Sequence, residues 1–225
     1  LQYRSKMPGK RWSNNWDLAL CLGSFVPALV FGVAFGNLFQ GLPFNFDELP
    51  RSTYTGSFWA LLNPFAIVCG LVSVLMLVLH GGVWLQMRAG GDIQQRSRRV
   101  AGITGLLLSV LLVVAGLWLY TSIPGYSISS AVIADASSNP LSKTVVQTAD
   151  WFNNYALYPM LWLLPLAAVV LPLLTSLLAW AGRYGLAFLT SSLSISSIIL
   201  LAGVTLFPFV MPSSTDMASS LTLWD

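Results

Sequence analysis

Residues 18–39 read LALCLGSFVPALVFGVAFGNLF and contain no Lys, Arg, Asp or Glu. A helix needs about 20 mostly apolar residues to cross the ~30 Å hydrocarbon core of a bilayer. A charged side chain at the centre of that core costs about 2.5–3.5 kcal/mol on insertion scales. An uncharged run of this length therefore predicts a transmembrane helix.

Four further runs have the same character, and they cover residues 58–79, 100–120, 157–181 and 187–211. Charged residues make up 8% of the chain, against about 25% in soluble proteins, and the mean hydropathy is +0.72. Backbone groups find no water in lipid, so each run must be helical. The sequence predicts an all-α polytopic membrane protein with five transmembrane helices. Its thinly spread charge excludes a nucleic-acid-binding domain.

Lysines and arginines are distributed unevenly among the segments that join these runs. Nine lie in the opening segment and in every second connection after it, whereas the alternate connections hold only Arg51 and Lys143. Because cytoplasmic segments carry the excess of Lys and Arg, the opening segment is predicted to be cytoplasmic. The predicted cytoplasmic segments are 1–17, 80–99 and 182–186, and the predicted periplasmic segments are 40–57, 121–156 and 212–225.

The two ends of the sequence suggest a piece of a longer protein. Leu1 leads directly into a basic segment without an initiator methionine, and Asp225 stops in a polar segment. We therefore expect residues before and after this chain, with processing as the alternative explanation of Leu1.

The two long periplasmic connections differ in their expected order. Segment 40–57 is rich in Gly and Pro, which break helices, so we expect an irregular loop ordered by its aromatic side chains. In segment 121–156, Ser138 or Asn139 is placed to cap a short helix that begins near Pro140, because Pro is favoured in the first helical turn.

Gly32 and Gly36 form a G-x-x-x-G pattern within the first run. Small residues one helical turn apart allow a second helix to approach closely. Both glycines are therefore candidate helix-packing residues. The neighbouring helix belongs either to the same chain, which is the favoured interpretation, or to a partner subunit.

Asn63 and Pro64 lie near one end of the second run. Pro64 has no backbone N–H, so we interpret it as a kink in the helix. Asn63 can bond the carbonyl freed by that kink or a polar group of a neighbouring helix. Contact of these two residues with a ligand is the less favoured alternative.

The chain offers few residues for catalysis or metal binding. It has no P-loop, no paired intramembrane carboxylates and no Ser–His–Asp set. His80, the one histidine, is a haem or metal ligand, a proton relay, or a side chain solvated at the membrane interface, and the last is favoured. We expect no catalytic and no metal-binding residue, which indicates a scaffold whose chemistry lies elsewhere.

Several stretches, taken in their order and spacing, resemble subunit II of bacterial cytochrome bd quinol oxidase, and together they run through nearly the whole chain. They are WDLALCLGSFVPALVFGVAFGNLFQGLPFNFDE at 16–48, YTGSFWALLNPFAIVCGLVSV at 54–74, LQMR at 85–88, SNPLSK at 138–143, LPLLT at 171–175, FPFVMPSST at 207–215 and SLTLWD at 220–225.

The resemblance implies a fold of two four-helix bundles and a peripheral helix, paired with a similarly folded subunit I. This chain would hold the cytoplasmic loop after the third helix, followed by helices four to eight. The charged residues of the family's proton route lie mainly in the helices before it. No catalytic residue is therefore carried over to this sequence.

The resemblance also implies the function. The complex would oxidise quinol and reduce oxygen to water in the bacterial cytoplasmic (inner) membrane, without pumping protons. Subunit I would carry haem b and haem d, and this haem-free, multi-pass subunit II would support it. Some members hold a structural quinone or small accessory single-helix subunits. The alternative from the residues alone is a fragment of a secondary transporter, with which the prolines inside the runs are compatible.

Overall fold

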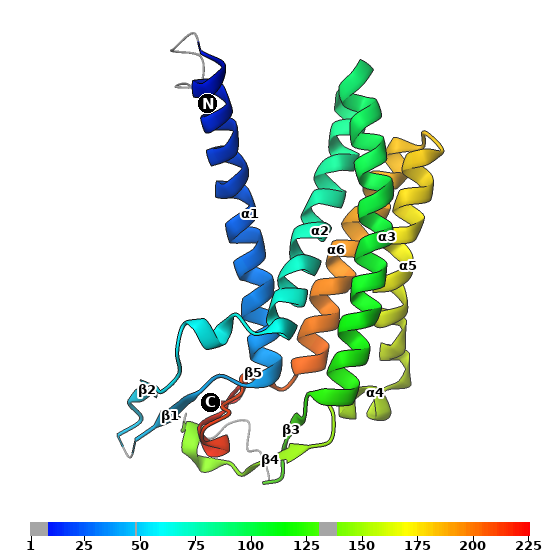
Figure 1. Cartoon of the computed structure of the whole chain (residues 1–225). Helices are drawn as coiled ribbons and strands as arrows, with labels where there is room; N and C mark the ends of the chain where they lie inside the picture. The colour runs from blue at the N-terminus through cyan, green and yellow to red at the C-terminus, as the bar shows by residue number, and fades with distance from the viewer. Residues whose placement is uncertain (1–8, 48, 131–138) are drawn as a thin grey trace.

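The computed structural model describes residues 9–47, 49–130 and 139–225, and five long helices dominate it (Figure 1). Each is long and apolar enough to cross a membrane. The prediction of an all-α polytopic membrane protein is therefore confirmed. The five helices are α1 (Lys10–Gln40), α2 (Pro64–Arg88), α3 (Gly91–Ser122), α5 (Leu163–Trp180) and α6 (Tyr184–Leu206).

Helices α2, α3, α5 and α6 pack together as a bundle, whereas α1 packs mainly against α2. In Figure 1, α1 diverges from α2 toward its N-terminus. The bundle interior is built from small and branched apolar side chains, as close packing in a bilayer requires. These buried side chains are Val72, Leu79, Val83, Ala101, Leu108, Ala179 and Ala187.

The two ends of the bundle are built differently (Figure 1). At one end, here the turn end, Ala89 and Gly90 join α2 to α3, and residues 181–183 join α5 to α6. At the other end, here the hairpin end, longer connections carry short strands and helical turns. The N-terminal end of α1 lies on the side of the turn end, and the C-terminus lies at the hairpin end.

The helices and the apolar runs do not end at the same residues. α1 begins at Lys10, within the segment 1–17 expected to be a loop, and α2 and α3 together make most of segment 80–99 helical. A helix satisfies its own backbone hydrogen bonds, so it continues into water beyond the apolar run that marks the bilayer. At the hairpin end, α6 stops at Leu206, before the run ends, because Pro208 disfavours helix in the residue before it.

The two connections at the hairpin end and the segment after α6 each form a short antiparallel hairpin, which corrects the expectation of an irregular loop over 40–57. The strands are too short to show an alternating pattern in the sequence. They pair as β1 (Phe44–Phe46) with β2 (Ser52–Tyr54), β3 (Gly125–Ile128) with β4 (Val145–Thr148), and β5 (Phe209–Met211) with β6 (Leu221–Thr222).

Short helical turns complete the hairpin end. The side chain of Asn139 accepts a hydrogen bond from Leu141 N at 3.0 Å, so the predicted cap before Pro140 is confirmed for Asn139; Ser138 lies outside the described residues. The turns are η1 (Trp59–Leu61), η2 (Pro140–Ser142), α4 (Asn153–Leu157), η3 (Pro159–Trp162) and η4 (Met217–Ser219).

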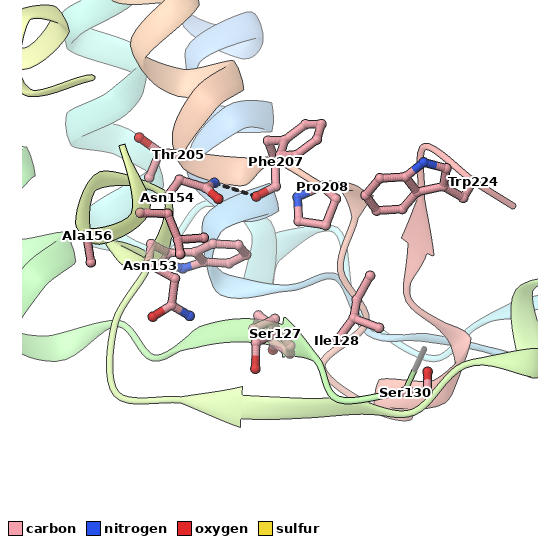
Figure 2. Close-up of a pocket in the computed structure, with 13 residues that line it drawn as sticks. Ser127, Ile128, Ser130, Asn153, Asn154, Ala156, Thr205, Phe207, Pro208 and Trp224 are labelled. Atoms are coloured by element: carbon pink, nitrogen blue, oxygen red, sulfur yellow. Dashed lines mark hydrogen bonds between the residues drawn. The ribbon is translucent and has the colours of Figure 1, made fainter. Parts of the chain in front are cut away.

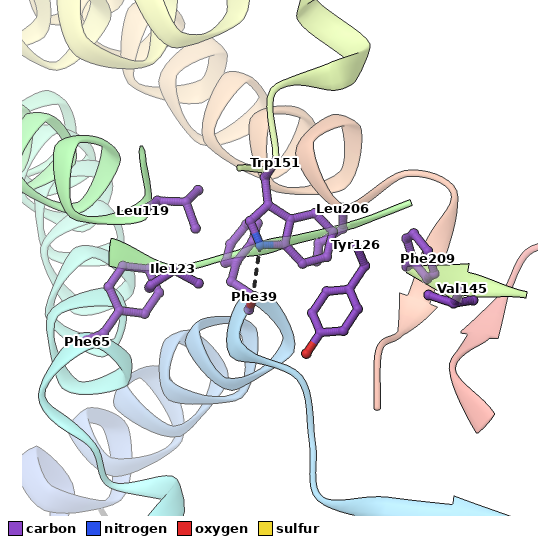
Figure 3. Close-up of a cluster of buried hydrophobic side chains, with 9 residues drawn as sticks. All are labelled: Phe39, Phe65, Leu119, Ile123, Tyr126, Val145, Trp151, Leu206 and Phe209. Carbon is purple, nitrogen blue, oxygen red and sulfur yellow. Dashed lines mark hydrogen bonds between the residues drawn. The ribbon is translucent and has the colours of Figure 1, made fainter. Parts of the chain in front are cut away.

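A cluster of buried aromatic and branched side chains joins the hairpins to the helix ends (Figure 3). Trp151 lies at its centre, where its ring contacts those of Phe39, Tyr126 and Phe209 with centroids 5.5–6.2 Å apart. Its indole N–H donates to Phe39 O at 3.0 Å. One tryptophan thus ties the end of α1 to β3 and β5. Below, "hairpin layer" means the three hairpins together with this cluster.

Candidate functional site

Two helices approach each other closely where α1 crosses α2. A Cβ atom added at Gly36 would come within 2.6 Å of Ala66 Cα, and one added at Gly32 within 2.6 Å of Gly70 Cα. Side-chain atoms almost never approach backbone so closely, so neither position has room for a methyl group. The structure thus places both candidate glycines against a helix of the same chain.

Asn63 is the N-cap of α2 and Pro64 its first residue, which corrects the interpretation of Pro64 as a kink. Proline is favoured here because the first helical N–H groups have no partner within the helix. The Asn63 Oδ1 accepts from Ala66 N at 2.8 Å and from Gln40 Nε2 at 3.0 Å. The apolar run beginning at residue 58 therefore starts before the helix does.

Asn63 also reaches α1 through a residue that sequence reasoning missed. Its Nδ2 donates to Asn37 Oδ1 at 3.0 Å, and Asn37 Nδ2 donates to Val33 O and Leu61 O, both at 2.8 Å. The amides of Asn37, Asn63 and Gln40 thus link α1 to the start of α2. Polar residues within an otherwise apolar run were the available signal, because a buried amide must find partners.

This amide network borders a small cavity at the hairpin end, with a volume of about 230 Å³. Gln40 and Asn63 contribute polar groups to its wall, and Phe65 and Trp118 pack edge to face on its apolar side, with ring centroids 5.9 Å apart. Asn63 therefore both joins α1 to α2 and lines a cavity that a small molecule can enter.

A second close contact, also missed from the sequence, joins α3 to α5. A Cβ at Gly105 would come within 2.5 Å of Pro172 O, and one at Gly102 would overlap the Trp180 indole. Ser176 Oγ donates to Ala101 O at 3.1 Å across the same interface. Ala101 and Gly105 lie one turn apart, so the spacing of small residues was the signal.

At the turn end, two arginines make contacts with tryptophan residues. The Arg98 guanidinium donates to Trp180 O, the last residue of α5, where a cation also complements the helix dipole. The Arg88 guanidinium lies 4.9 Å from the centroid of the Trp84 ring. These contacts fix two of the basic residues that set the predicted orientation.

His80 is held between α2 and α6. Its Nδ1 lies 2.9 Å from Ser191 Oγ, which itself donates to Phe188 O at 2.8 Å. The imidazole tautomer sets which of the two atoms donates in this pair. The imidazole also packs on the Phe188 ring at 4.9 Å. His80 is thus a packed side chain rather than a freely solvated one, and the described residues bring no second histidine or carboxylate to form a metal site with it.

A larger pocket opens at the hairpin end, with a volume of about 510 Å³ (Figure 2). Its wall combines aromatic side chains, among them Trp151 and Trp224, with polar ones from α4. Asn154 donates to Val204 O at 2.8 Å and to Phe207 O at 2.7 Å, so one amide satisfies carbonyls at the end of α6. Asn154 thus ties α4 to the end of α6 at the wall of the pocket.

Two tyrosines beside this pocket are buried. Burial raises the pKa of the Tyr126 phenol. Burial also raises the pKa of Tyr155, while its 2.7 Å hydrogen bond to Thr205 Oγ1 acts in the opposite direction. Neither phenol is therefore a base at neutral pH, and both act here as packing and hydrogen-bonding groups.

A buried ion pair joins the β3–β4 hairpin to the last residue of the chain. Lys143 Nζ lies 2.7 Å from Asp225 Oδ2, with side chains 7% and 9% exposed. Lys143 also donates to Pro140 O at 2.7 Å, and Asp225 accepts from Thr222 N at 2.6 Å. Both charges are thus paired and hydrogen-bonded, as buried charges need to be.

Comparison with known proteins identifies a family. The sequence model of cytochrome bd terminal oxidase subunit II matches residues 1–225. A probable cytochrome oxidase subunit 2 of Haemophilus influenzae is 48% identical over 225 residues, which is 100% of this chain. Cytochrome bd-I ubiquinol oxidase subunit 2 of Escherichia coli K12 is 50% identical over 224 residues, or 99% of this chain.

The matched region is part of each relative. This chain spans 59% of the length of the Haemophilus influenzae and Escherichia coli proteins. A cytochrome bd ubiquinol oxidase subunit 2 of Bacillus subtilis is 30% identical over 120 residues, covering 53% of this chain and 34% of that protein. Five spanning helices and bacterial relatives indicate a multi-pass protein of the bacterial inner membrane. The chain belongs to the cytochrome bd terminal oxidase subunit II family.

Proposed function

We propose that this chain is part of subunit II of a bacterial cytochrome bd-type quinol oxidase. In this proposal the complex oxidises quinol, reduces oxygen to water and takes protons from the cytoplasm, which generates a proton-motive force without pumping. The observation that carries the proposal is the family match over all 225 residues. It favours this function over the secondary transporter considered as the alternative.

Within the complex, the role proposed for this subunit is structural. The chain has one histidine in 225 residues, and the Nδ1 of that histidine is bonded to Ser191. Haem irons are usually held by histidine, cysteine or methionine side chains presented into a haem-sized pocket. The bond at Nδ1 leaves Nε2 free, but the imidazole packs on the Phe188 ring at 4.9 Å and lines neither of the two pockets described above. We therefore assign haem b and haem d to subunit I and no catalytic residue to this chain.

The packing of the helices supports a scaffold role. Gly32 and Gly36 bring the backbones of α1 and α2 into contact, and Gly105 does the same for α3 and α5. In lipid such close approach replaces the hydrophobic effect as the source of helix association. A bundle built in this way keeps its shape, and can therefore hold a neighbouring subunit in a fixed position.

The proposed orientation places the turn end in the cytoplasm. Both short turns of the bundle lie there, on the same side as the N-terminal end of α1 (Figure 1). The basic residues of segments 80–99 and 182–186 therefore gather at this end, whereas Arg51 and Lys143 lie at the hairpin end. Cytoplasmic ends carry the excess of Lys and Arg, so the hairpin layer is periplasmic in this proposal.

The proposed partner is the haem-bearing subunit I, in a heterodimer that small accessory single-helix subunits can join. Quinol is the proposed substrate of the complex, and a structural quinone is the proposed non-covalent cofactor in this subunit. The cavity beside Asn63 and the larger pocket at the hairpin end are the described spaces in which one end of such a molecule can be sought.

Co-purification tests the proposal. The full-length protein is tagged and purified from membranes of cells that also express the haem-bearing subunit. We expect the two subunits to elute together, with b- and d-type haem absorption and quinol-dependent oxygen consumption. Recovery of the tagged protein without haem absorption or quinol oxidation, or substrate uptake by vesicles that contain it alone, would contradict the proposal.

A further inference from the structure

Gln86 is a fully buried polar side chain in an apolar setting. It lies in the last turns of α2 and is 0% exposed. Leu79 and Val83, also almost completely buried, lie at helical spacing on the same face of α2 and belong to the apolar interior of the bundle. The carboxamide of Gln86 is therefore directed into that interior, near the turn end.

Neither end of this carboxamide has a partner among the described residues. Both Nε2 and Oε1 are buried and make no hydrogen bond there. The backbone of Gln86, by contrast, is satisfied, and Gln94 Nε2 donates to its carbonyl at 2.9 Å. Nearly all buried polar atoms in folded proteins are paired with protein or with ordered water. The Gln86 side chain therefore needs a hydrogen-bonding ligand that is completely enclosed by the protein.

The chemistry of the amide selects that ligand. The NH2 group needs an acceptor and the C=O group needs a donor, so the ligand must be able both to donate and to accept. A metal cation cannot bond the NH2 group, and the described residues hold no cluster of His, Cys, Asp or Glu to complete its coordination. Full burial excludes a partner polypeptide. Water meets each of these requirements.

Spare room exists beside Gly82, one turn before Gln86 on α2. A Cβ added at Gly82 would lie 3.6 Å from Ala101 Cβ and 3.7 Å from Ser97 O of α3, which are ordinary contact distances. The crossing of α2 and α3 is therefore looser here than the crossing of α1 and α2 at Gly32. The carbonyl of Ser97 borders this space and can accept a further hydrogen bond.

We propose that Gln86 binds an internal water molecule between α2 and α3, in the space beside Gly82 and within reach of the Ser97 carbonyl. The water accepts from Gln86 Nε2, donates one proton to Gln86 Oε1 and donates the other to Ser97 O. This site is separate from the contacts of α1 with α2 and from the pockets at the hairpin end. It makes the turn end of the bundle a hydrated contact rather than a dry one.

Filling the space tests the proposal. Gly82→Ala adds a methyl group that would displace the water and leave the Gln86 amide unpaired. We expect this variant of the purified complex to melt at a lower temperature than Gly81→Ala. Gly81 has no atom within 4 Å of an added Cβ, so Gly81→Ala reports the gain in helix propensity alone. In a Gln86→Leu background, no buried amide remains to lose its hydrogen-bond partner. There we expect Gly82→Ala to stabilise the complex as much as Gly81→Ala does.

The effect of Gly82→Ala with and without Gln86 shows whether the space beside Gly82 holds water or is dry. If the space is dry, Gly82→Ala stabilises the complex with or without Gln86, and the proposal is overturned. If Gly82→Ala prevents assembly, recovery of the complex by Gln86→Leu supports the proposal. If Gln86→Leu does not restore assembly, a density map of the unaltered complex that resolves ordered waters decides. A peak within hydrogen-bonding distance of the Gln86 carboxamide supports the proposal. The absence of such a peak overturns it.

Discussion

Where α1 meets α2, the closest contacts are made by backbone atoms, whereas where the hairpins meet they are made by aromatic rings. Gly32 and Gly36 leave no space for a methyl group between the two helices. In the hairpin layer, Trp151 is surrounded by the rings of Phe39, Tyr126 and Phe209. Backbone atoms make the closest approach in the first contact, and the second consists of side chains.

The difference follows from the solvent on each side. Lipid tails are as apolar as the helices, so burial of side chains gives little drive for association, and close packing with a few interhelical hydrogen bonds must replace it. The hairpin layer lies beyond the helix ends, where water makes the burial of large apolar side chains favourable. The same chain therefore uses small residues in one region and large ones in the other.

The largest effect is expected in the hairpin layer. Trp151→Ala removes the ring at the centre of the cluster and the hydrogen bond to Phe39 O, at a cost of about 3–5 kcal/mol. Amide hydrogen exchange of β3 and β4 should accelerate while that of α2 and α3 stays slow. Trp59→Ala is the control, because Trp59 is 77% exposed. Equal effects of the two substitutions would show that the cluster does not hold the layer.

The buried ion pair of the same layer should have the next largest effect. Lys143→Met leaves the Asp225 carboxylate buried without its partner, which typically costs about 3–5 kcal/mol. The thermal melting midpoint of the complex should fall, and the C-terminal segment should become sensitive to protease. Arg51→Met is matched to it as an exposed cation at the same end and should change the midpoint little. An unchanged melting midpoint for Lys143→Met would mean that the ion pair is not buried in the complex.

The contact between α1 and α2 should be disturbed by substitutions that enlarge a side chain, because its glycines leave no room for a larger one. Gly32→Leu forces α1 and α2 apart, and overpacking of this kind costs about 1–3 kcal/mol. The yield of assembled complex and its haem content should both fall. Gly116→Leu places the same side chain in α3, where nothing lies within 4 Å of an added Cβ. Normal yield and haem content for Gly32→Leu would show that the close α1–α2 contact is not needed for assembly of the complex.

A small effect is expected from alkaline pH. Burial raises the pKa of Tyr126 and of Tyr155 in the folded protein, whereas in the unfolded chain both ionise near the ordinary pKa of about 10. Stability from these phenols is therefore complete below that pH and is lost as the pH rises through their folded pKa values. Replacing each tyrosine by Phe should reduce the loss of stability above pH ~10, measured by thermal melting. An unchanged pH profile would show that neither phenol contributes.

The spanning helices could be predicted from the sequence because hydrocarbon imposes a requirement that each run of residues must meet alone. Length and lack of charge are visible within one segment, as in residues 18–39. The position of Gly32 and Gly36 followed for the same reason, since a small-residue pattern marks a packing face. Which helix packs on that face depends on the tertiary structure, and only the structure identifies α2.

The missed features depend on contacts between distant segments. The hairpin strands are two to four residues long, too short for an alternating pattern, and Trp151 acts through rings from three other parts of the chain. Pro64 was misread because a proline within an apolar run signals a kink or a start equally well. The hydrogen bond of Asn63 to Ala66 N decides between them.

Haem content after loss of the one histidine is the most direct test of the central claim, that this chain supports the haem-bearing subunit without binding haem through its own side chains. His80→Ala removes the imidazole that bonds Ser191 and leaves the close helix contacts untouched. The account predicts an assembled complex with the same ratio of haem b and haem d to protein as the unaltered one. Loss of either haem from an otherwise intact complex would contradict it.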